Sequence, residues 1–548
     1  MKNNYLILLL FTFLACENSI EKPPNIVLIM MDDMNDYPEV FNGHPQAKTP
    51  NIKKLANSGI SFLKAYTNDP MCGPSRASMI MGVYPHNSSN FWQESWLKNE
   101  VLANTKTMME KFKENGYNVV GSGKILHHHS PEIWTEFEHR ADYGPVLYKG
   151  ERKKGKRGVA HPDVPEPFSS IGQIDGSYGP FRKLRSFEKI NEQLSWAYGG
   201  SRGYKEFKYN SEEDRDLTPD EINAKWAEDK LTELASSDNK EPFFLAVGFV
   251  RPHTPLIAPQ KYFDLYPLED IQLANILEND KEDTFRNYIT DDNTNLKDFE
   301  VESSSLTHKQ LKKRWVEMYE KLQKSYQDSN EGLRRFTQAY LACVSAVDDN
   351  IGQVINAIDN SELRDNTIIV LVSDHGWTMG EKDHVYKNSL WEESTRVPLI
   401  IRAPNAIGGS QVNHPVSLID IYPTLLELAG LDTETKKNDK GKSLDGYSLV
   451  PFLKDPETKE WDGPEAALTV VYSSDNNKNK PANHHYSIRT KDWRYIIYDS
   501  GKEELYHNAE DPKEWNNLVF NKIHPKRDEM VEILKEMTYP MVPNGLNN

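Results

Sequence analysis

Apolar residues along the chain gather in short runs that alternate with amphipathic stretches. Residues 25–31 form an apolar, β-rich run that stops at two aspartates, which is typical of a strand buried on both faces. Stretches with helical spacing and a closing glycine follow at 50–59 and 105–116. Further apolar runs occur at 242–250, 367–372 and 397–401. This alternation predicts an α/β fold with a mostly parallel central sheet and helices on both faces.

A different pattern begins after a polar stretch, residues 433–464, which we interpret as a linker. Short β-like runs occur at 468–472, 486–489 and 493–498, and a helical pattern spans about 526–537. The sequence therefore predicts a main domain over 23–432 and a small C-terminal subdomain over 465–548, with an antiparallel sheet and one helix. Within the main domain, two stretches break the alternation and are predicted to be surface insertions, about 131–225 and about 270–330.

The N-terminus carries an export pattern. Lys2 precedes an apolar run from Tyr5 to Ala15 that ends at Cys16. The run is too short for a transmembrane helix, which needs about 20 residues, and no other apolar stretch approaches that length. Residues 1–16 are predicted to be a signal peptide. Its end resembles a bacterial lipoprotein signal, which implies lipidation at Cys16 and a cell-surface or periplasmic location; simple secretion is the alternative.

Charge and cysteine content narrow the function. The formal net charge of -17 argues against nucleic-acid or anionic-membrane partners, since those surfaces attract an excess of Lys and Arg. With Cys16 in the signal, only Cys72 and Cys343 remain, which excludes a disulfide framework. Cys343 lies in a stretch of helical apolar spacing and is predicted to be a small buried residue. Cys72 needs another explanation.

Polar residues follow several of the predicted strands. In open α/β sheets ligands collect at the carboxyl ends of the strands, so these residues are expected to share a pocket. They are Asp32 and Asp33, Lys124 and His127, His253, and Asp374 and His375. An isolated pair of aspartates usually caps a helix, but a pair directly after a buried strand favours metal binding. Hard oxygen ligands suit calcium or magnesium, although an imidazole at position 375 suits transition metals better.

The segment MCGPSRASMIMG carries the most specific motif, Cys72-Gly73-Pro74-Ser75-Arg76. It resembles the signature of type I sulfatases, and the similarity extends over the whole mature chain, most closely to iduronate-2-sulfatases. The resemblance implies an alkaline-phosphatase-like α/β/α sandwich. It also implies that a formylglycine-generating enzyme converts Cys72 into formylglycine (3-oxoalanine). One hydroxyl of the aldehyde hydrate then attacks sulfur, and the other expels sulfate by regenerating the aldehyde.

The resemblance also implies roles for the other residues. One calcium ion is expected on Asp32, Asp33, Asp374, His375 and the modified Cys72. Arg76 is expected to hold the hydrate and the ligand network, and Lys124 a sulfate oxygen. His127 would accept a proton when sulfate is eliminated, and His253 and Lys387 would flank the leaving alcohol. Trp377, and less strongly Trp92, is a candidate surface for sugar stacking, with a packed core aromatic as the alternative.

The sequence thus predicts an exported sulfatase acting on a sulfated carbohydrate, for example a uronic-acid 2-sulfate or ulvan. Two alternatives stay open. One is a phosphodiester or phosphonate hydrolase of the same superfamily, whose members usually carry Thr or Ser at the nucleophile position. The other is a non-catalytic glycan-binding surface protein in which Cys72 is never oxidised.

Overall fold

The computed structural model of the chain describes residues 22–149, 157–187, 194–199, 205–238, 241–284, 317–473 and 479–547. The predicted signal peptide, including Cys16, lies outside the described residues, and so do parts of both predicted insertions. Over the described ranges, no helix combines the length and the apolar character needed to cross a membrane.

A central sheet of eight strands organises the larger part of the molecule. In spatial order its strands are β15 (Ser410–Val412), β2 (Ile60–Phe62), β14 (Leu399–Arg402), β12 (Thr367–Ser373), β1 (Asn25–Asp32), β10 (Phe243–Pro252), β4 (Asn118–Gly123) and β5 (Glu136–Arg140). The five strands from β12 to β5 run parallel to their neighbours, whereas β14 is antiparallel to β12. The predicted mostly parallel sheet is confirmed.

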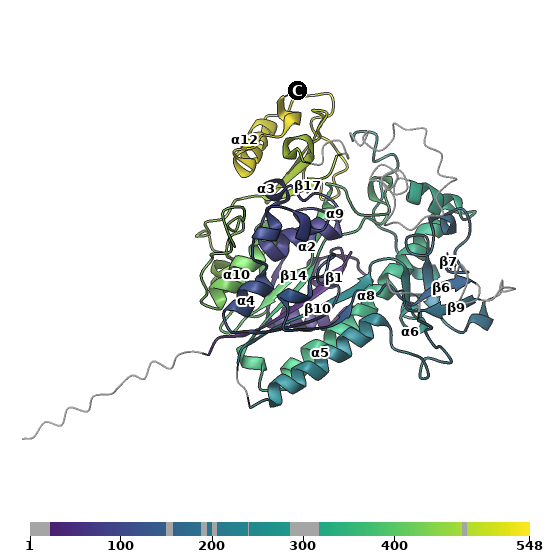
Figure 1. Cartoon of the computed structure of the whole chain (residues 1–548). Helices are drawn as coiled ribbons and strands as arrows, with labels where there is room; N and C mark the ends of the chain where they lie inside the picture. Colours follow the sequence, from purple (N-terminus) through teal and green to yellow (C-terminus); the bar gives the residue numbers. More distant parts are fainter. Residues whose placement is uncertain are drawn as a thin grey trace, which may run out of the picture.

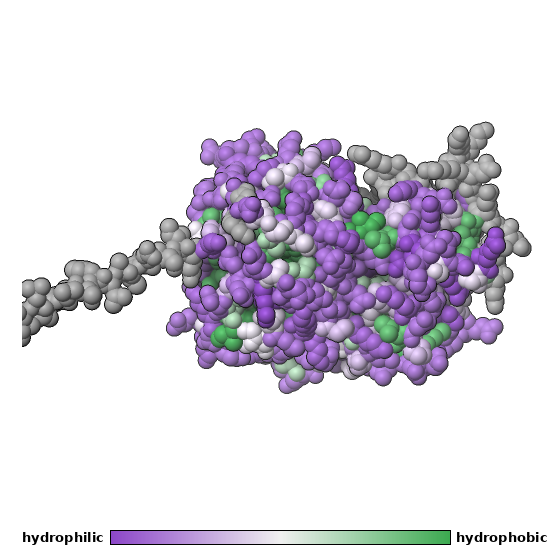
Figure 2. Space-filling model, turned by 90° about the horizontal axis from the view of Figure 1, so that it is seen from below, coloured by the Kyte–Doolittle hydropathy of each residue, from purple (hydrophilic) through white to green (hydrophobic). Residues whose placement is uncertain are grey.

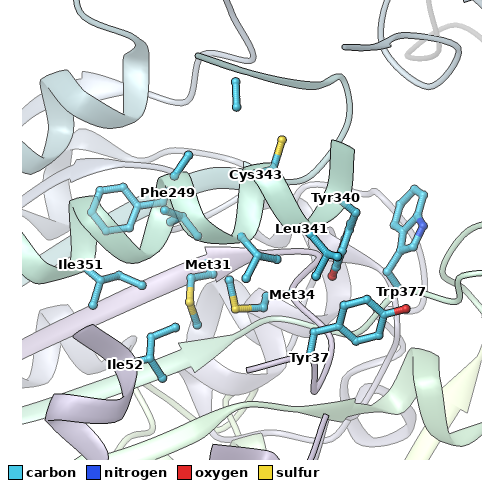
Figure 3. Packing of buried hydrophobic residues seen from close by; sticks show 14 of the residues in the cluster. Met31, Met34, Tyr37, Ile52, Phe249, Tyr340, Leu341, Cys343, Ile351 and Trp377 are labelled. Atoms are coloured by element: carbon cyan, nitrogen blue, oxygen red, sulfur yellow. The ribbon is translucent and has the colours of Figure 1, made fainter. Parts of the chain in front are cut away.

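Helices cover both faces of this sheet, as Figure 1 shows. One layer contains α1 (Pro50–Ser58), α5 (Pro219–Ser236) and α8 (Ser329–Asp359), and the other contains α2 (Cys72–Met81), α4 (Met108–Glu114) and α10 (Ile421–Leu428). Alternate residues of β1 enter the two cores: Met31 packs in the first and Met30 in the second. Figure 3 shows Met31 and Cys343 of α8 within the first core, where Cys343 is fully buried, as predicted.

The C-terminal residues form a separate four-stranded antiparallel sheet. Its strands are β17 (Ala467–Val471), β18 (His485–Arg489), β19 (Trp493–Ile497) and β20 (Glu503–His507), and α12 (Lys526–Thr538) packs on it. The sequence pattern did not identify β20. At the edge of this sheet, Val470 N donates to Asn68 O, so β17 lies beside the segment that leads into α2.

The insertions differ from the prediction in one respect. Residues 136–140, which we assigned to the first insertion, are strand β5 of the central sheet, so that assignment was wrong. The charged alternation of Glu136–Arg140 concealed an edge strand with only partly buried side chains. Among the described residues of the insertion, β7 (Arg157–Val159), β6 (Val146–Lys149) and β9 (Leu194–Ala197) form a small sheet, while β8 (Tyr178–Phe181) pairs with β11 (Leu256–Pro259).

Shorter elements complete the described structure. The two-residue strands β13 (Arg396–Val397), β3 (Ala65–Tyr66) and β16 (Val416–Ser417) form one small sheet, and the short helices are α3 (Pro85–Ser88), α6 (Gln260–Phe263), α9 (Glu392–Thr395) and α11 (Val450–Lys454). Helix α11 falls in the predicted linker, and its Phe452 and Leu453 are buried in the core that contains α2. The domain boundaries stay a prediction.

The surface is mainly hydrophilic. Figure 2 shows one face of the molecule, on which apolar side chains occur as small separate patches among polar ones. This agrees with a mean hydropathy of -0.69 and a net charge of -17.

Candidate active site

Cys72 is the first residue of helix α2, which starts directly below the carboxyl ends of the parallel strands. Its side chain is 3% exposed. The sulfur accepts a hydrogen bond from Lys387 Nζ at 3.1 Å and lies 3.3 Å from His375 Nε2. Burial raises the pKa of the Cys72 thiol. The thiol is therefore enclosed by residues more than 300 positions away in the sequence.

Asp32 and Asp33 end strand β1 in a tight backbone turn. Asp33 has a positive φ of 63°, which is uncommon for a residue other than glycine. Its carbonyl accepts a hydrogen bond of 2.7 Å from the hydroxyl of Tyr340 on α8, and its N–H donates to Asp374 Oδ1 at 3.2 Å. Figure 3 shows Tyr340 on α8 near this end of β1. These contacts hold the turn that brings both carboxylates to one site.

Arg76, one turn after Cys72 on α2, links two of the carboxylates. Its Nε donates to Asp374 Oδ2 at 2.8 Å, and one terminal nitrogen donates to Asp32 Oδ1 at 3.2 Å. Other donors of the guanidinium bind the carbonyls of Met31, Lys124 and Ile125. A planar fork with five donors can satisfy this geometry, whereas a lysine could not.

Carboxylates and other ligand atoms gather closely enough to hold a metal ion. The ligand atoms of Asp32, Cys72, Asp374 and His375 lie within 4.8 Å of one another, and so do those of Asp32, Asp33, Cys72 and His253. Asp33 Oδ2 is buried without a hydrogen-bond partner among the described residues. Burial raises the pKa of Asp33 well above its usual value in spite of the nearby Lys387. The donor set is dominated by hard oxygen atoms, so these residues fit calcium.

Lys124 follows strand β4 and pairs with the metal-binding cluster. Its ammonium group forms a buried ion pair with Asp32. The backbone reaches this position because Gly123 has a φ of +85° and packs against β10, where a Cβ atom would lie 1.9 Å from Gly248 O. Burial raises the pKa of Asp32, but the charges of Lys124, Arg76 and other nearby cations together outweigh this effect and bring that pKa well below its usual range.

His127 lies three residues further on, at the open side of the site. Its side chain is exposed, unlike those of the neighbouring cluster. Desolvation and the charge of Lys124 lower the pKa of His127. A neutral imidazole can accept a proton, so the chemistry of His127 is compatible with the predicted role as a base.

His253 approaches the site from the end of β10. Its Nε2 lies 3.7 Å from Asp33 Oδ2, and burial and the charge of Lys387 lower its pKa well below the usual value. The segment is held by Arg251, which donates to the carbonyls of His253, Ile257, Tyr143 and Gly144. Arg251 thereby fixes His253 against the first insertion.

Lys387 completes the group of cations. It donates to Asp33 Oδ1 at 2.6 Å. Burial lowers the pKa of Lys387, but Asp33 and the other acidic groups nearby together outweigh burial and raise that pKa. Its ammonium group lies 5.8 Å from the ring centroid of Trp377 and 5.6 Å from that of Tyr386. Trp377 is 2% exposed and packs edge-on against Tyr386. Its ring is therefore covered, and the sugar-stacking role stays a prediction that this burial does not support.

The structure brings together every residue that the sequence analysis placed in the pocket, apart from Trp377, which lies beneath it, and His127, which lies at its edge. Trp92, the weaker stacking candidate, is half-buried and stacks on Tyr472 at 5.8 Å. The sequence analysis missed Tyr143, whose ring lies 4.9 Å from Lys124 Nζ and 5.0 Å from the His253 ring. No periodicity marks Tyr143. Arg251, by contrast, directly precedes the Pro-His pair and could have been noticed.

A three-layer α/β fold with buried carboxylates, cations and an enclosed thiol at the carboxyl ends of its strands defines a hydrolase of the alkaline-phosphatase-like class. The chain belongs to the sulfatase family: residues 24–138 and 173–431 match that family, and residues 380–540 match the C-terminal part of N-sulphoglucosamine sulphohydrolases. It is a sulfuric ester hydrolase.

Relatives with full-length similarity support this assignment. The chain is 32% identical to a sulfatase from Formosa agariphila, over 95% of this chain and 89% of the relative. An ulvan-active sulfatase of the same bacterium is 27% identical, with 93% and 81% covered. The iduronate 2-sulfatase of Mus musculus is 26% identical, with 92% and 93% covered.

Solved structures share the fold. A protein in complex with its substrate D-glucosamine-2-N,6-O-disulfate superposes with a TM-score of 0.65 at 22% identity, covering 95% of this chain and 99% of the other. A phosphonate monoester hydrolase from Silicibacter pomeroyi gives a TM-score of 0.64 at 17% identity, with 94% of both chains covered. At these identities the likeness concerns the fold alone.

Proposed function

We propose that this sulfatase hydrolyses sulfate esters of carbohydrates, with a formylglycine hydrate made from Cys72 as nucleophile and calcium as the metal. The observation that carries the proposal is the position of Cys72, buried on the first turn of α2 among carboxylates and cations, with Lys387 Nζ at 3.1 Å. A carbohydrate substrate, of the uronate 2-sulfate or ulvan type, is supported by the ulvan-active and iduronate relatives and by the disulfated glucosamine bound in the similar structure.

Calcium would be held by Asp32, Asp33, Asp374, His375 and the modified residue 72. When bound, it would supply the positive charge that polarises a sulfate oxygen and the nucleophile. Arg76 keeps Asp32 and Asp374 in position, with a 2.8 Å bond to the latter. Because these groups are fixed before substrate arrives, little reorganisation is needed during the reaction.

The remaining side chains act on the sulfate and on protons. The hydrate supplies one hydroxyl as nucleophile and a second one for elimination of sulfate. Lys124, buried beside Asp32, binds a sulfate oxygen, and the equally buried Lys387 lies 3.1 Å from the Cys72 sulfur. His253 and Lys387 flank the leaving alcohol, where the ammonium charge of Lys387 stabilises the departing oxygen, and the neutral His127 accepts a proton when sulfate leaves.

The predicted export, the lipid anchor on Cys16 and maturation by a formylglycine-generating enzyme belong to the same proposal. An exported enzyme can reach polymeric glycans that do not enter the cell. The apolar run up to Ala15 and the net charge of -17 support an exported protein that binds neither nucleic acid nor anionic membranes.

A phosphodiester or phosphonate hydrolase is the second candidate, because the phosphonate hydrolase mentioned above shares the fold with a TM-score of 0.64. The Cys72-Gly73-Pro74-Ser75-Arg76 motif argues against it, since formylglycine formation is the function of that motif in the sulfatases that this chain resembles. A glycan-binding protein without catalysis would have no use for the buried cations.

The test is sulfate release from a panel of sulfated oligosaccharides, combined with the mass of the peptide containing residue 72. Conversion to formylglycine lowers that mass by about 18 Da and removes the alkylatable thiol. We expect converted protein to release sulfate from one class of glycan and Cys72→Ala to release none. Converted protein that cleaves only phosphate or phosphonate esters would overturn the proposed reaction.

A further inference from the structure

Three side chains around the first turn of α2 carry buried oxygen atoms without hydrogen-bond partners in the described part of the chain. Both carboxylate oxygens of Asp69 are of this kind, and its side chain is 0% exposed. Gln93 Oε1 and Asn388 Oδ1 are the others. Buried polar atoms in native proteins are nearly always paired, so a group of unpaired ones needs an explanation.

Contacts with the start of α2 bring these three side chains close to the nucleophile. A Cβ atom built on Gly73 would lie 2.5 Å from Gln93 Oε1, so the Gln93 amide sits directly on the residue after Cys72. Asn388 N donates to Pro70 O at 3.1 Å, next to Asp69. Asn388 also follows Lys387, whose Nζ reaches the Cys72 sulfur. Asp69 itself lies near enough to Cys72 that the thiol adds to the effect of burial in raising the pKa of Asp69.

The unpaired atoms have one chemical property in common. The oxygens of an ionised carboxylate and the carbonyl oxygen of an amide accept hydrogen bonds and cannot donate them. A ligand that completes this set must therefore supply O–H or N–H donors. A carboxylate or a second sulfate could not pair with these oxygens and would be repelled by the Asp69 carboxylate.

Other parts of the site already account for the anionic part of a substrate. The cations Lys124, Lys387 and Arg76 are paired with Asp32, Asp33 and Asp374, and none of them forms an ion pair with Asp69. The unpaired oxygens of Asp69, Gln93 and Asn388 belong to residues beside the start of α2 and are separate from this group of ion pairs. Gln93 is half-buried, so this set of oxygens extends from the nucleophile toward solvent.

We propose that Asp69, Gln93 and Asn388 form a subsite that accepts hydrogen bonds from free hydroxyl groups of the sugar ring that carries the sulfate ester. The inference rests on the proposed function and adds to it a selection among saccharides. A ring with neighbouring hydroxyls is favoured over one that presents a carboxylate or a further sulfate on that side. A saccharide that lacks one of these hydroxyls would leave buried acceptors of the enzyme unpaired. This cost would let the enzyme discriminate strongly against such a saccharide.

The experiment compares two substrates of formylglycine-containing protein: a sulfated saccharide that the wild type cleaves, and an aryl sulfate without hydroxyl groups. For Asp69→Ala we expect the ratio of kcat/KM for the saccharide to kcat/KM for the aryl sulfate to fall by about tenfold, as expected when a buried hydroxyl of the substrate loses its hydrogen-bond partner. Asp69→Asn, which keeps the shape, should lower the ratio in the same direction and remain folded if the alanine variant does not.

A deoxy substrate separates binding from a structural role. Each hydroxyl next to the sulfated carbon is replaced in turn by hydrogen. At one position this replacement should lower kcat/KM of the wild type by the same factor as the Asp69→Ala substitution does. The deoxy substrate for that position should cause no further loss of kcat/KM in Asp69→Ala. The matched control is Asp283→Asn, since Asp283 also has an unpaired buried oxygen but bonds Asn517 N, at 2.6 Å, far along the chain. Its ratio should stay at the wild-type value.

The outcomes are distinguishable. If converted wild-type protein cleaves neither substrate, the proposed function fails. If it cleaves both and the ratio in Asp69→Ala equals that of the wild type, or if the deoxy substrates lose activity equally in wild type and variant, the subsite is wrong and the sulfatase proposal stands. An unfolding temperature of Asp69→Asn at or above that of the wild type supports a binding role, because a structural carboxylate would lower it when neutralised.

Discussion

Tyr143 connects two of the proposed catalytic side chains although it comes from the first insertion. Its ring lies 4.9 Å from Lys124 Nζ and makes an edge contact with His253 at 5.0 Å. Burial raises the pKa of Tyr143 to about 12, so the phenol keeps its proton at neutral pH. The ring limits the movement of both side chains and holds the Lys124 ammonium toward Asp32.

Replacing Tyr143 should therefore impair catalysis through the ring more than through the hydroxyl. A cation–π contact of this kind is worth about 0.5–2 kcal/mol, so Tyr143→Leu should lower kcat/KM for sulfate hydrolysis by about two- to thirtyfold. Tyr143→Phe keeps the ring and should lose less activity than Tyr143→Leu. Steady-state kinetics of both variants with equal formylglycine content gives the comparison; a larger loss in the phenylalanine variant would show that the hydroxyl is the important group.

At the same scale, the sequence identified residues with a local motif and missed those that depend on the tertiary fold. Cys72, Asp32 and Asp374 follow strands or sit in a specific motif, and their gathering could be predicted from strand polarity. Tyr143 and Tyr340 reach the site from an insertion and from the middle of a 31-residue helix. Trp377 had a suggestive position, but only its packing against Tyr386 shows that its ring is covered.

Among the elements, the short helix α3 joins the main fold to the C-terminal sheet. His86 in α3 is 5% exposed, stacks on Tyr84 at 5.2 Å and makes an edge contact with Tyr486 of β18 at 6.3 Å. Its Nδ1 has no partner in the described residues. Burial, and to a smaller extent the charge of Lys442, lowers the pKa of His86 to about 3.

This contact should make stability depend on pH. The pKa of His86 in the folded chain is below its unfolded value, so its contribution is complete above about pH 6.5 and is lost as pH falls toward 3. Between pH 7 and pH 5 we expect the unfolding free energy of the wild type to fall by about 2 kcal/mol more than that of His86→Phe, which keeps an aromatic ring. Urea denaturation at both pH values measures the difference. Equal losses in the two proteins would contradict the assignment.

The elements themselves could be predicted where burial imposes a clear period. Strands β1 and β12 are apolar on both faces and were recognised, as was the helical stretch of α8 that includes Cys343. Strand β5 has alternating exposed residues at the edge of the sheet, and β20 mixes charged and aromatic residues. Pairing with a neighbouring strand stabilises both, and pairing partners are not visible in a local pattern.

For the molecule as a whole, the metal-binding cluster lies where β1, β12, α2 and the segment around Lys387 meet. Three buried carboxylates in one place repel one another, and one Asp33 oxygen stays unpaired among the described residues. A bound calcium ion would remove both penalties and connect these elements.

Removing calcium should therefore destabilise the entire fold and abolish sulfatase activity. At a free calcium concentration about 100 times the Kd, binding contributes about 2.7 kcal/mol to stability. We expect EGTA to lower the unfolding temperature and added calcium to restore it, with activity following the same course. Asp33→Asn serves as the control, since its unfolding temperature should respond much less to either addition. If neither EGTA nor added calcium changes the unfolding temperature of the wild type, calcium is excluded as a structural ligand.

The enclosure of Cys72 sets a limit on when the proposed conversion to formylglycine can occur. The Lys387 ammonium that covers its sulfur is encoded 315 residues later. At roughly 5–20 residues per second, synthesis of that interval takes about 15–60 seconds. During this time the thiol cannot be covered by Lys387, and afterwards folding competes with the modifying enzyme. The yield of active enzyme would then depend on the relative rates of translation, export and oxidation, so slower synthesis should raise the formylglycine content of the finished protein.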